Sequence, residues 1–246
     1  AAKNAAKNNF KTLLVDEKNE LGGSTIFENN EFNKIDNKTP SEWLKKEIEE
    51  LKNIKNLEIK TRTSVAAYHQ YNYLLAKENL TDHLEAKDKT NKIRQRLLKI
   101  RAKKVILATG ALERPLIFNN NDRPGIMLSS AIKKYSEFYG VACGSKNVFF
   151  TNNDSAYESA LSLYNKGINV EAIVDIRDQS ESKIVKKIEE AGIKIYWSHT
   201  IVDTAGYKRL NSVSIMKLSN DGTSVTGSKI SISCDCLGVA GGWTPA

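Results

Sequence analysis

The sequence predicts an α/β protein built from two lobes with one plan. In each half an apolar strand ends in an acid, at Asp16 and at Asp175, and a later apolar strand ends in Ala-x-Gly, at residues 108–110 and 240–242. The residues between these strands alternate helical periodicity with short strands. Together these features predict two Rossmann-like dinucleotide-binding lobes with parallel sheets and inserted antiparallel strands, of the two-dinucleotide-binding flavoprotein type.

The first lobe, which we place at residues 1–140, opens with a short helix and a strand. Residues 1–7 have helical character, residues 11–15 read as a strand, and a turn follows at residues 21–24. Thr39-Pro40-Ser41-Glu42 has the form of a capping box with Pro at the first helical position, so we expect a helix from there to about Lys55. The strands expected after it are residues 57–61, 64–68, 74–77, 92–101 and the apolar run 105–108.

The second lobe, residues 141–246, starts afresh at Asn147 and is expected to be degenerate. Residues 148–150 read as its first strand, Asp154 as a helix cap, and Gly167 as the stop of a helix that runs to Lys166. The later elements are expected to be a strand at 170–174, a helix at 181–191, and strands at 195–197, 212–218, 228–233 and 237–239.

Both ends of the chain suggest a truncated domain. The first residue is Ala rather than Met, and the opening helix leads directly into a strand. The last five residues begin a turn after an apolar strand. We therefore expect the first lobe to lack its N-terminal strand and its Gly-rich turn.

Composition narrows the partners and the compartment. The net charge of +8 comes from lysines scattered along the chain, so nucleic acid is not expected as a partner. No apolar run has the length of a membrane span. The three cysteines occur without a secretion signal, which indicates a reducing compartment and favours the cytoplasm.

The end of the first strand carries the candidate ribose site. An acid there accepts hydrogen bonds from the adenosine ribose about 20 residues after the Gly-rich turn, so that turn would precede residue 1. Asp16 is the better candidate and Glu17 the second. The turn of Gly22, Gly23 and Ser24 would let the backbone approach the nucleotide closely. The alternatives are a solvated acid at a strand end and ordinary loop glycines.

The apolar run 105–108 ends in small residues. Ala108, Thr109 and Gly110 would allow a cofactor to pass across the carboxyl ends of the parallel strands. A tight turn between strand and loop is the alternative interpretation. In the second lobe the equivalent fingerprint positions hold Thr151, Asn153 and Ala156, and side chains at the first two would crowd a pyrophosphate, so we expect lost or altered binding there.

Catalytic and metal-binding candidates are not found in the sequence. His69, His83 and His199 are isolated and lack metal-ligand spacing. Cys234 and Cys236 do not form the Cys-x-x-Cys pair of a redox centre, so we interpret them as packing residues. We predict no catalytic residue and no metal ligand.

Several segments together resemble the alpha subunit of heterotetrameric sarcosine oxidase. The longest runs from Ala-Thr-Gly-Ala-Leu-Glu-Arg-Pro-Leu at residues 108–116 through Phe-Asn-Asn-Asn-Asp-Arg-Pro-Gly-Ile-Met-Leu at residues 118–128. The others are residues 61–65, Tyr68, residues 72–73, 81–84, 150–157 and 241–245. The resemblance extends over essentially the whole chain and places it in the FAD/NAD(P)-binding, pyridine nucleotide-disulfide oxidoreductase-like superfamily.

The resemblance implies a function within a larger complex. That complex oxidatively demethylates sarcosine to glycine with tetrahydrofolate and O2, giving H2O2, and it carries FAD, FMN and NAD. The alpha subunit would hold NAD, with FAD as the alternative at the same site, and would bind folate through a domain absent here. Its partners would be the other sarcosine oxidase subunits. By motif position the residues lining the dinucleotide would be Asp16, Gly22, Gly23, Val65, Thr109 and Gly110, with Glu113 and Arg114 beside it.

Other functions remain open at this stage. An opine-oxidase-type subunit and an NAD(P)H-dependent flavin oxidoreductase share the architecture. A degenerate domain kept for subunit assembly is the non-enzyme alternative. A Gly-rich turn upstream of Ala1 would argue against the last. We expect the chain by itself to be inactive and to retain dinucleotide weakly or not at all.

Overall fold

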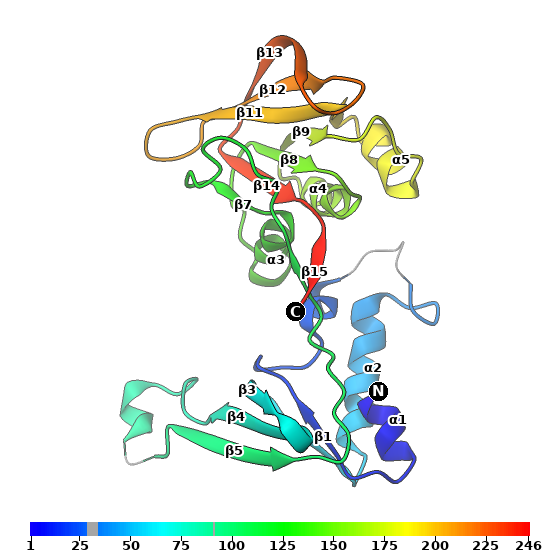
Figure 1. The fold of residues 1–246 in the computed structure, drawn as a ribbon, viewed down its shortest axis with the longest axis vertical. Coiled ribbons are helices and arrows are strands. Elements are labelled where there is room, and N and C mark those ends of the chain that lie inside the picture. The colour runs from blue at the N-terminus through cyan, green and yellow to red at the C-terminus, as the bar shows by residue number, and fades with distance from the viewer. Residues whose placement is uncertain (29–33, 91) are drawn as a thin grey trace. The chain divides into compact units, whose positions relative to one another are not determined.

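The computed structural model describes residues 1–28, 34–90 and 92–246. They form two compact units, Ala1–Ala108 and Thr109–Ala246 (Figure 1). The first unit contains α1 (Ala2–Lys7), β1 (Thr12–Val15), η1 (Gly23–Phe27), α2 (Pro40–Lys52), β2 (Leu57–Lys60), β3 (Thr63–His69), η2 (Gln70–Asn72), β4 (Tyr73–Asn79), η3 (Ala86–Lys89) and β5 (Gln95–Arg101).

Helix α2 begins at the predicted capping box. The Thr39 hydroxyl accepts a hydrogen bond from Glu42 N at 3.4 Å, and the Glu42 carboxylate accepts one from Thr39 N at 3.1 Å. Pro40 occupies the first helical position, where its missing N–H costs nothing. The prediction of a helix here is confirmed, and it ends at Lys52.

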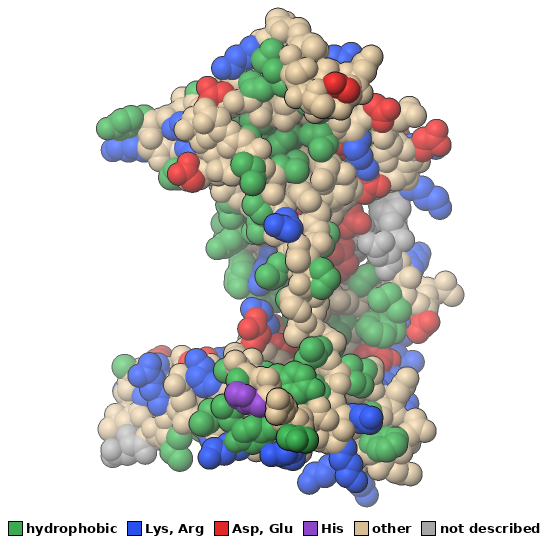
Figure 2. All heavy atoms as spheres, viewed as in Figure 1, with side chains coloured by type: hydrophobic (Ala, Val, Ile, Leu, Met, Phe, Trp, Pro, Cys, Tyr) green, Lys and Arg blue, Asp and Glu red, His purple; other side chains and the backbone are tan. Residues whose placement is uncertain are grey.

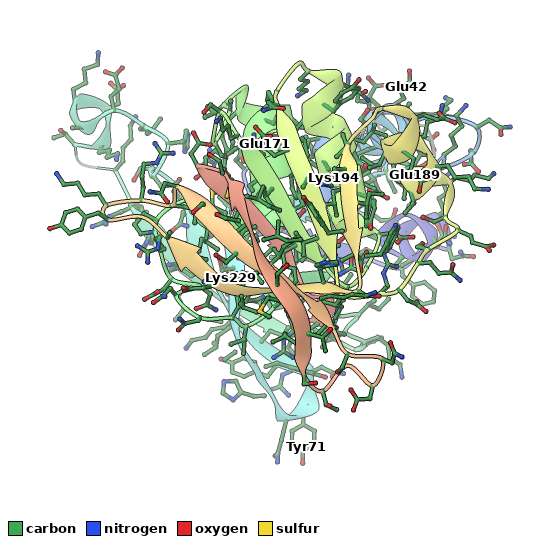
Figure 3. All side chains as sticks on the ribbon, turned by 90° about the horizontal axis from the view of Figure 1, so that it is seen from above. Glu42, Tyr71, Glu171, Glu189, Lys194 and Lys229 are labelled. Carbon is green, nitrogen blue, oxygen red and sulfur yellow. The ribbon has the colours of Figure 1, made fainter. Side chains whose placement is uncertain are left out.

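The strands of the first unit form two separate sheets. β1 and β2 pair in parallel, and β3, β4 and β5 form an antiparallel sheet in that order. The turn between β3 and β4 carries Tyr71 at positive φ with its ring 82% exposed, and Figure 3 shows this ring pointing away from the ribbon.

The predicted buried strand at residues 105–108 is wrong. These residues have no strand geometry, and Ile106 and Leu107 are 67% and 68% exposed. A parallel strand is buried only when a neighbouring strand pairs with its backbone and helices cover its faces. Among the described residues β1 pairs with β2 alone, so the apolar run has no strand beside it. Its apolar composition predicted burial, but composition alone does not reveal whether a strand pairs with it.

The second unit is organised around a five-stranded parallel sheet with strand order β10-β9-β8-β14-β7 (Figure 1). Its elements are β6 (Ala111–Glu113), β7 (Ile126–Leu128), α3 (Ser129–Tyr139), β8 (Asn147–Thr151), α4 (Ser155–Asn165), β9 (Val170–Asp175), α5 (Lys183–Glu190), β10 (Lys194–Trp197), β11 (His199–Ala205), β12 (Ser212–Leu218), β13 (Val225–Ser233), β14 (Cys236–Ala240) and β15 (Trp243–Pro245).

The pleat of β8 divides the core of this unit into two layers. Phe149 points to one face, where it packs with residues of α3, α4 and α5. Val148 and Phe150 point to the other face, where they pack with the antiparallel sheet β11-β12-β13. β8 and β14 are buried along their whole length, as expected for strands covered on both faces.

Residues 109–140, which the sequence groups with the first lobe, lie in the second unit. β7 pairs in parallel with β14, and Ile126 is the register partner of Leu237. Helix α3 then returns along the sheet and buries Ile132 against it. Neither β7 nor α3 was predicted, because β7 has three residues and α3 has no Ser, Thr, Asp or Asn cap before it.

Helix α4 begins at the predicted cap residue, but a neighbouring side chain makes the capping contact. Asp154 is the N-cap residue, but its side chain makes no capping hydrogen bond. Asn153 Oδ1 instead accepts hydrogen bonds from Ser155 N at 3.0 Å and Ser155 Oγ at 2.6 Å. Asp154 pairs with Arg177, whose charge attracts the carboxylate more strongly than an amide does.

The surface agrees with the scattered charges of the sequence. Lys and Arg side chains are spread over the viewed face of both units rather than gathered into one strip (Figure 2). Across residues 1–28, 34–90 and 92–246, no helix combines the length and the apolar character that a membrane crossing requires.

Candidate dinucleotide site

Asp16 lies at the carboxyl end of β1, where its backbone is held from two sides. Asp16 N donates to Lys60 O at 2.9 Å, and Asp16 O accepts from Thr63 N at 2.9 Å. Its side chain accepts a hydrogen bond from Lys18 N through Oδ1 at 2.9 Å. The second carboxylate oxygen takes no part in that bond. This geometry fixes the direction of the carboxylate at the edge where a parallel sheet receives a ligand.

Glu17, the second candidate, is engaged differently. Its carboxylate lies 2.8 Å from the Lys18 ammonium, and the hydrogen bond to Lys18 lowers the pKa of Glu17. The side chain is 61% exposed. A solvated ion pair of this kind is weak, so Glu17 has the setting of a surface acid. The arrangement favours Asp16 over Glu17 as the ribose acceptor.

The Gly22 turn is one that only glycine can form. Gly22 has φ of 122°, and a Cβ built on it would lie 2.2 Å from Leu44 Cδ2. Gly23 also has positive φ, but the space around it is open. Ser24 follows as an exposed residue of η1. The turn therefore packs closely on α2 on one side and leaves main chain uncovered on the other, as close approach of a nucleotide requires.

Val65 belongs to the same unit. It lies on β3 two residues after Thr63, whose N–H binds Asp16 O, and residues two apart in a strand share a face. Its side chain is 46% exposed. Val65 thus offers an exposed apolar surface on a strand that is tied to the end of β1.

The remaining predicted residues lie beyond this group. Ala108 is the last residue of the first unit, and the second unit begins with Thr109. Thr109 Oγ1 donates to Ala246 O at 2.6 Å, and Gly110 O accepts from Ala246 N at 3.1 Å. Gly110 has φ of 77°. Thr109 and Gly110 are thus both engaged with the last residue of the chain.

Glu113 and Arg114 anchor a two-stranded ribbon of β6 and β15. Arg114 N donates to Gly242 O at 2.8 Å, Gly241 N donates to Arg114 O at 2.6 Å, and Arg114 Nη1 lies 3.4 Å from Thr244 Oγ1. Glu113 is the register partner of Trp243. The exposed Arg114 side chain lies along this ribbon.

Glu113 has a structural role that the sequence did not reveal. It is only 8% exposed, and its Oε2 accepts a hydrogen bond from Ser130 N at 2.8 Å in the first turn of α3. Leu128, the N-cap residue, provides no side-chain acceptor, so Glu113 fills that place from a distant strand. Burial raises the pKa of the Glu113 carboxyl. The signal could be found only once α3 was known.

The predicted site residues are divided between the two units. The first unit contains Asp16, Glu17, Gly22, Gly23, Ser24, Val65 and Ala108, and the second contains Thr109, Gly110, Glu113 and Arg114. Within the described residues no group of three or more His, Cys, Asp or Glu side chains could hold a metal ion. Cys234 and Cys236 are buried, and burial raises the pKa of both thiols to about 12, which suits packing rather than reactivity.

The comparison with solved structures identifies the fold. The chain has the α/β architecture of FAD- and NAD-binding oxidoreductases. It superposes on T. acidophilum thioredoxin reductase with a TM-score of 0.69 at 18% identity, covering 99% of this chain and 73% of that one. For L-proline dehydrogenase from P. horikoshii the TM-score is 0.63 at 20% identity, covering 99% of this chain and 39% of that one.

The sequence comparisons name a particular relative, and the predicted resemblance is confirmed. The chain is 35% identical to sarcosine oxidase subunit alpha of Corynebacterium sp. (strain P-1) over 247 aligned residues. It is 32% identical to the same subunit of Rhizobium meliloti (strain 1021). Both alignments cover 100% of this chain but only 25% and 23% of those subunits, so the chain spans about a quarter of their length. No family model matches the chain.

Proposed function

We propose that this chain is the dinucleotide-binding part of an oxidoreductase subunit, with the adenosine half of the site at the end of β1. The observation that carries the proposal is the placement of Asp16 at the end of β1. Its backbone is held there, and only one of its two carboxylate oxygens takes part in the hydrogen bond from Lys18 N. The same unit contains the turn at Gly22 and Gly23, whose main chain is uncovered on one side. An acid at that position accepts hydrogen bonds from ribose hydroxyls. The chain's own residues therefore suit a dinucleotide.

The subunit proposed is sarcosine oxidase alpha. In that assembly sarcosine would be oxidatively demethylated to glycine, with O2 reduced to H2O2 and the methyl carbon passed to tetrahydrofolate. The similarity to three curated sarcosine oxidase alpha subunits supports the proposal. The other subunits would be its partners, and FAD and FMN would be bound elsewhere in the complex. A dinucleotide supplies electron-transfer chemistry when it is bound.

Each residue has a separate part in binding. Asp16 would accept from the ribose hydroxyls, the main chain at Gly22 and Gly23 would lie against the nucleotide, and Val65 would provide an apolar surface. Thr109, Gly110 and Arg114 belong to the second unit, and their part in binding stays a prediction from the sequence. NAD is the proposed ligand, with FAD as the alternative, since both present the same adenosine. The nucleotide released from the purified whole subunit, identified by chromatography, distinguishes them.

The test of the proposal is NAD⁺ binding by the whole subunit after substitution of Asp16. Loss of a hydrogen bond to a charged group costs about 1.5–3 kcal/mol, so Asp16→Ala should weaken binding by roughly 10- to 150-fold. Titration calorimetry measures the dissociation constant. Glu17→Gln tests the neighbouring acid, and Glu20→Gln, an exposed acid in the same segment, is the matched control. Equal affinities in Asp16→Ala and Glu20→Gln would exclude Asp16 as the ribose acceptor.

A further inference from the structure

The second unit contains the position of a second dinucleotide site. β8, the turn after it, α4 and β9 form the strand-turn-helix-strand segment that binds a dinucleotide in folds of this class. In such folds the N–H groups at the helix start hold the pyrophosphate, and the acid that ends the second strand holds the ribose. The fold class therefore implies a ligand here, and the residues at both halves can be checked for fit.

At the pyrophosphate half, side chains occupy the places of the missing glycines. The Thr151 hydroxyl lies 3.1 Å from Ala240 O and accepts from Asn153 N at 3.0 Å. The Asn153 amide nitrogen donates to Ala240 O at 3.2 Å, and its oxygen accepts from Ser155 N at 3.0 Å. Asn153 N and Ser155 N, two donors at the start of α4 that would serve a phosphate, are thus already bound within the turn.

At the ribose half, the acid is saturated by its own neighbours. Asp175 is fully buried. Its Oδ1 accepts from Arg177 N at 2.9 Å and from Arg177 Nε at 3.1 Å. Its Oδ2 accepts from Tyr157 Oη at 2.8 Å and from Arg177 Nη2 at 2.8 Å. A carboxylate has about four lone-pair sites, and these four contacts use them, so none remains for a ribose hydroxyl.

Arg177 joins the two halves. Its Nη2 lies 2.8 Å from Asp154 Oδ1 in the turn as well as 2.8 Å from Asp175 Oδ2. One guanidinium is shared between two carboxylates, so the group formed by Asp154, Tyr157, Asp175 and Arg177, here the Arg177 cluster, is net negative. Burial and the adjacent Asp175 charge raise the pKa of Tyr157, which keeps its hydroxyl a donor. An entering pyrophosphate would meet like charge.

We propose that the Arg177 cluster and the Thr151–Asn153 turn close the nucleotide position of the second unit, so that this unit binds neither NAD nor FAD. The unit keeps the strands and the helix of a dinucleotide site. Asn153 N and Ser155 N in the turn, and the Asp175 carboxylate, are nevertheless hydrogen-bonded to neighbouring residues of the same unit. It follows, resting on the proposed function, that the subunit holds one dinucleotide and holds it in the first unit.

The test counts the dinucleotides bound by the whole subunit. Equilibrium dialysis with NAD⁺, and separately with FAD, is carried out on the unsubstituted subunit, on Asp16→Ala and on Arg177→Ala. Arg177→Lys, which keeps the positive charge, replaces Arg177→Ala if that variant unfolds, and circular dichroism checks folding. We expect one equivalent at most, lost in Asp16→Ala and unchanged within about twofold in affinity in Arg177→Ala.

The other outcomes separate the two proposals. A second equivalent that persists in Asp16→Ala overturns the closure of the second unit and leaves the proposed function standing. A single equivalent lost in Arg177→Ala but unaffected by Asp16→Ala overturns both. A subunit that binds no dinucleotide overturns the proposed first-unit site while the second unit's rejection of dinucleotide stands.

Discussion

At the scale of single residues, Glu113 shows how one buried carboxyl can connect distant parts of a unit. It lies on β6, pairs through its backbone with Trp243, and reaches Ser130 N at the start of α3. Its other oxygen, Oε1, is buried and has no hydrogen-bond partner within residues 1–28, 34–90 and 92–246. A buried ionised group with an unsatisfied oxygen is costly, which agrees with the raised pKa.

This arrangement predicts a pH-dependent effect of Glu113→Gln. The folded chain holds the Glu113 proton more tightly than the unfolded chain, so its contribution to stability is greatest below the ordinary glutamate pKa and is lost as pH rises through the raised one. Gln keeps the acceptor for Ser130 N and cannot ionise. The melting temperature of Glu113→Gln relative to the unsubstituted chain should therefore rise with pH over this window.

Thermal unfolding measured across that pH range checks the prediction, and a difference that does not change with pH would contradict it. Glu113→Ala is the comparison variant, because it removes the acceptor altogether. Its loss of a helix-capping interaction should cost about 1 kcal/mol.

At the scale of elements, the close approach of α3 to the sheet depends on a glycine in β14. A Cβ on Gly238 would lie 2.6 Å from ring atoms of Phe149 and 3.1 Å from Ile132 Cδ1. Phe149 and Ile132 are both fully buried, so neither side chain can move into solvent. The glycine therefore sets the distance between helix and sheet.

Gly238→Ala should destabilise the chain by about 1–3 kcal/mol through overpacking. Phe149→Ala alone should cost about 3–5 kcal/mol through the cavity it leaves. The double variant should cost less than the sum, because the new methyl group enters that cavity. Urea unfolding of the three variants measures the coupling, and strict additivity would show that the Cβ meets a different obstacle.

Local patterns predicted most elements of both units, and their failures have physical causes. The capping box fixed the start of α2, and the apolar runs fixed β8, β9 and β14, because those signals lie within the element itself. Helix α3 is capped by Glu113 from another strand, so its start left no local signal. The run at residues 105–108 has the composition of a buried strand, but pairing depends on a neighbour elsewhere in the chain.

The candidate site shows the same division. Asp16 and Gly22 could be proposed from the sequence because the signals, an acid directly after a strand and a glycine in a turn, lie in neighbouring residues. The saturation of Asp175 could not, since Tyr157 and Arg177 reach it only through the packing of α4 against β9. The sequence predicted lost or altered binding in the second lobe because the fingerprint glycines are absent. The structure adds the contacts of Thr151, Tyr157 and Arg177 on which the proposed closure rests.

At the scale of the whole molecule, the two units differ in how much core they possess. Among the described residues, the two hydrophobic clusters belong to the second unit, where β8 and β14 are entirely buried. In the first unit β1 is only half-buried along its length. Stability is therefore expected to be unequal along the chain.

Hydrogen exchange of the 246-residue chain tests this difference. Amides of β1 and β2 should exchange faster than those of β8 and β14, because opening the first unit exposes less apolar surface. Mass spectrometry of peptides from each strand reports the rates. Equal protection in both pairs of strands would show that the chain opens as one cooperative body.

The β6–β15 ribbon joins residues that lie far apart in the sequence. Ala246 N donates to Gly110 O, and Thr109 Oγ1 donates to Ala246 O. Bringing such distant residues together costs loop-closure entropy, which must be offset by other native contacts. The ribbon is therefore expected to pair late in folding, after the sheet encoded between its two strands has formed.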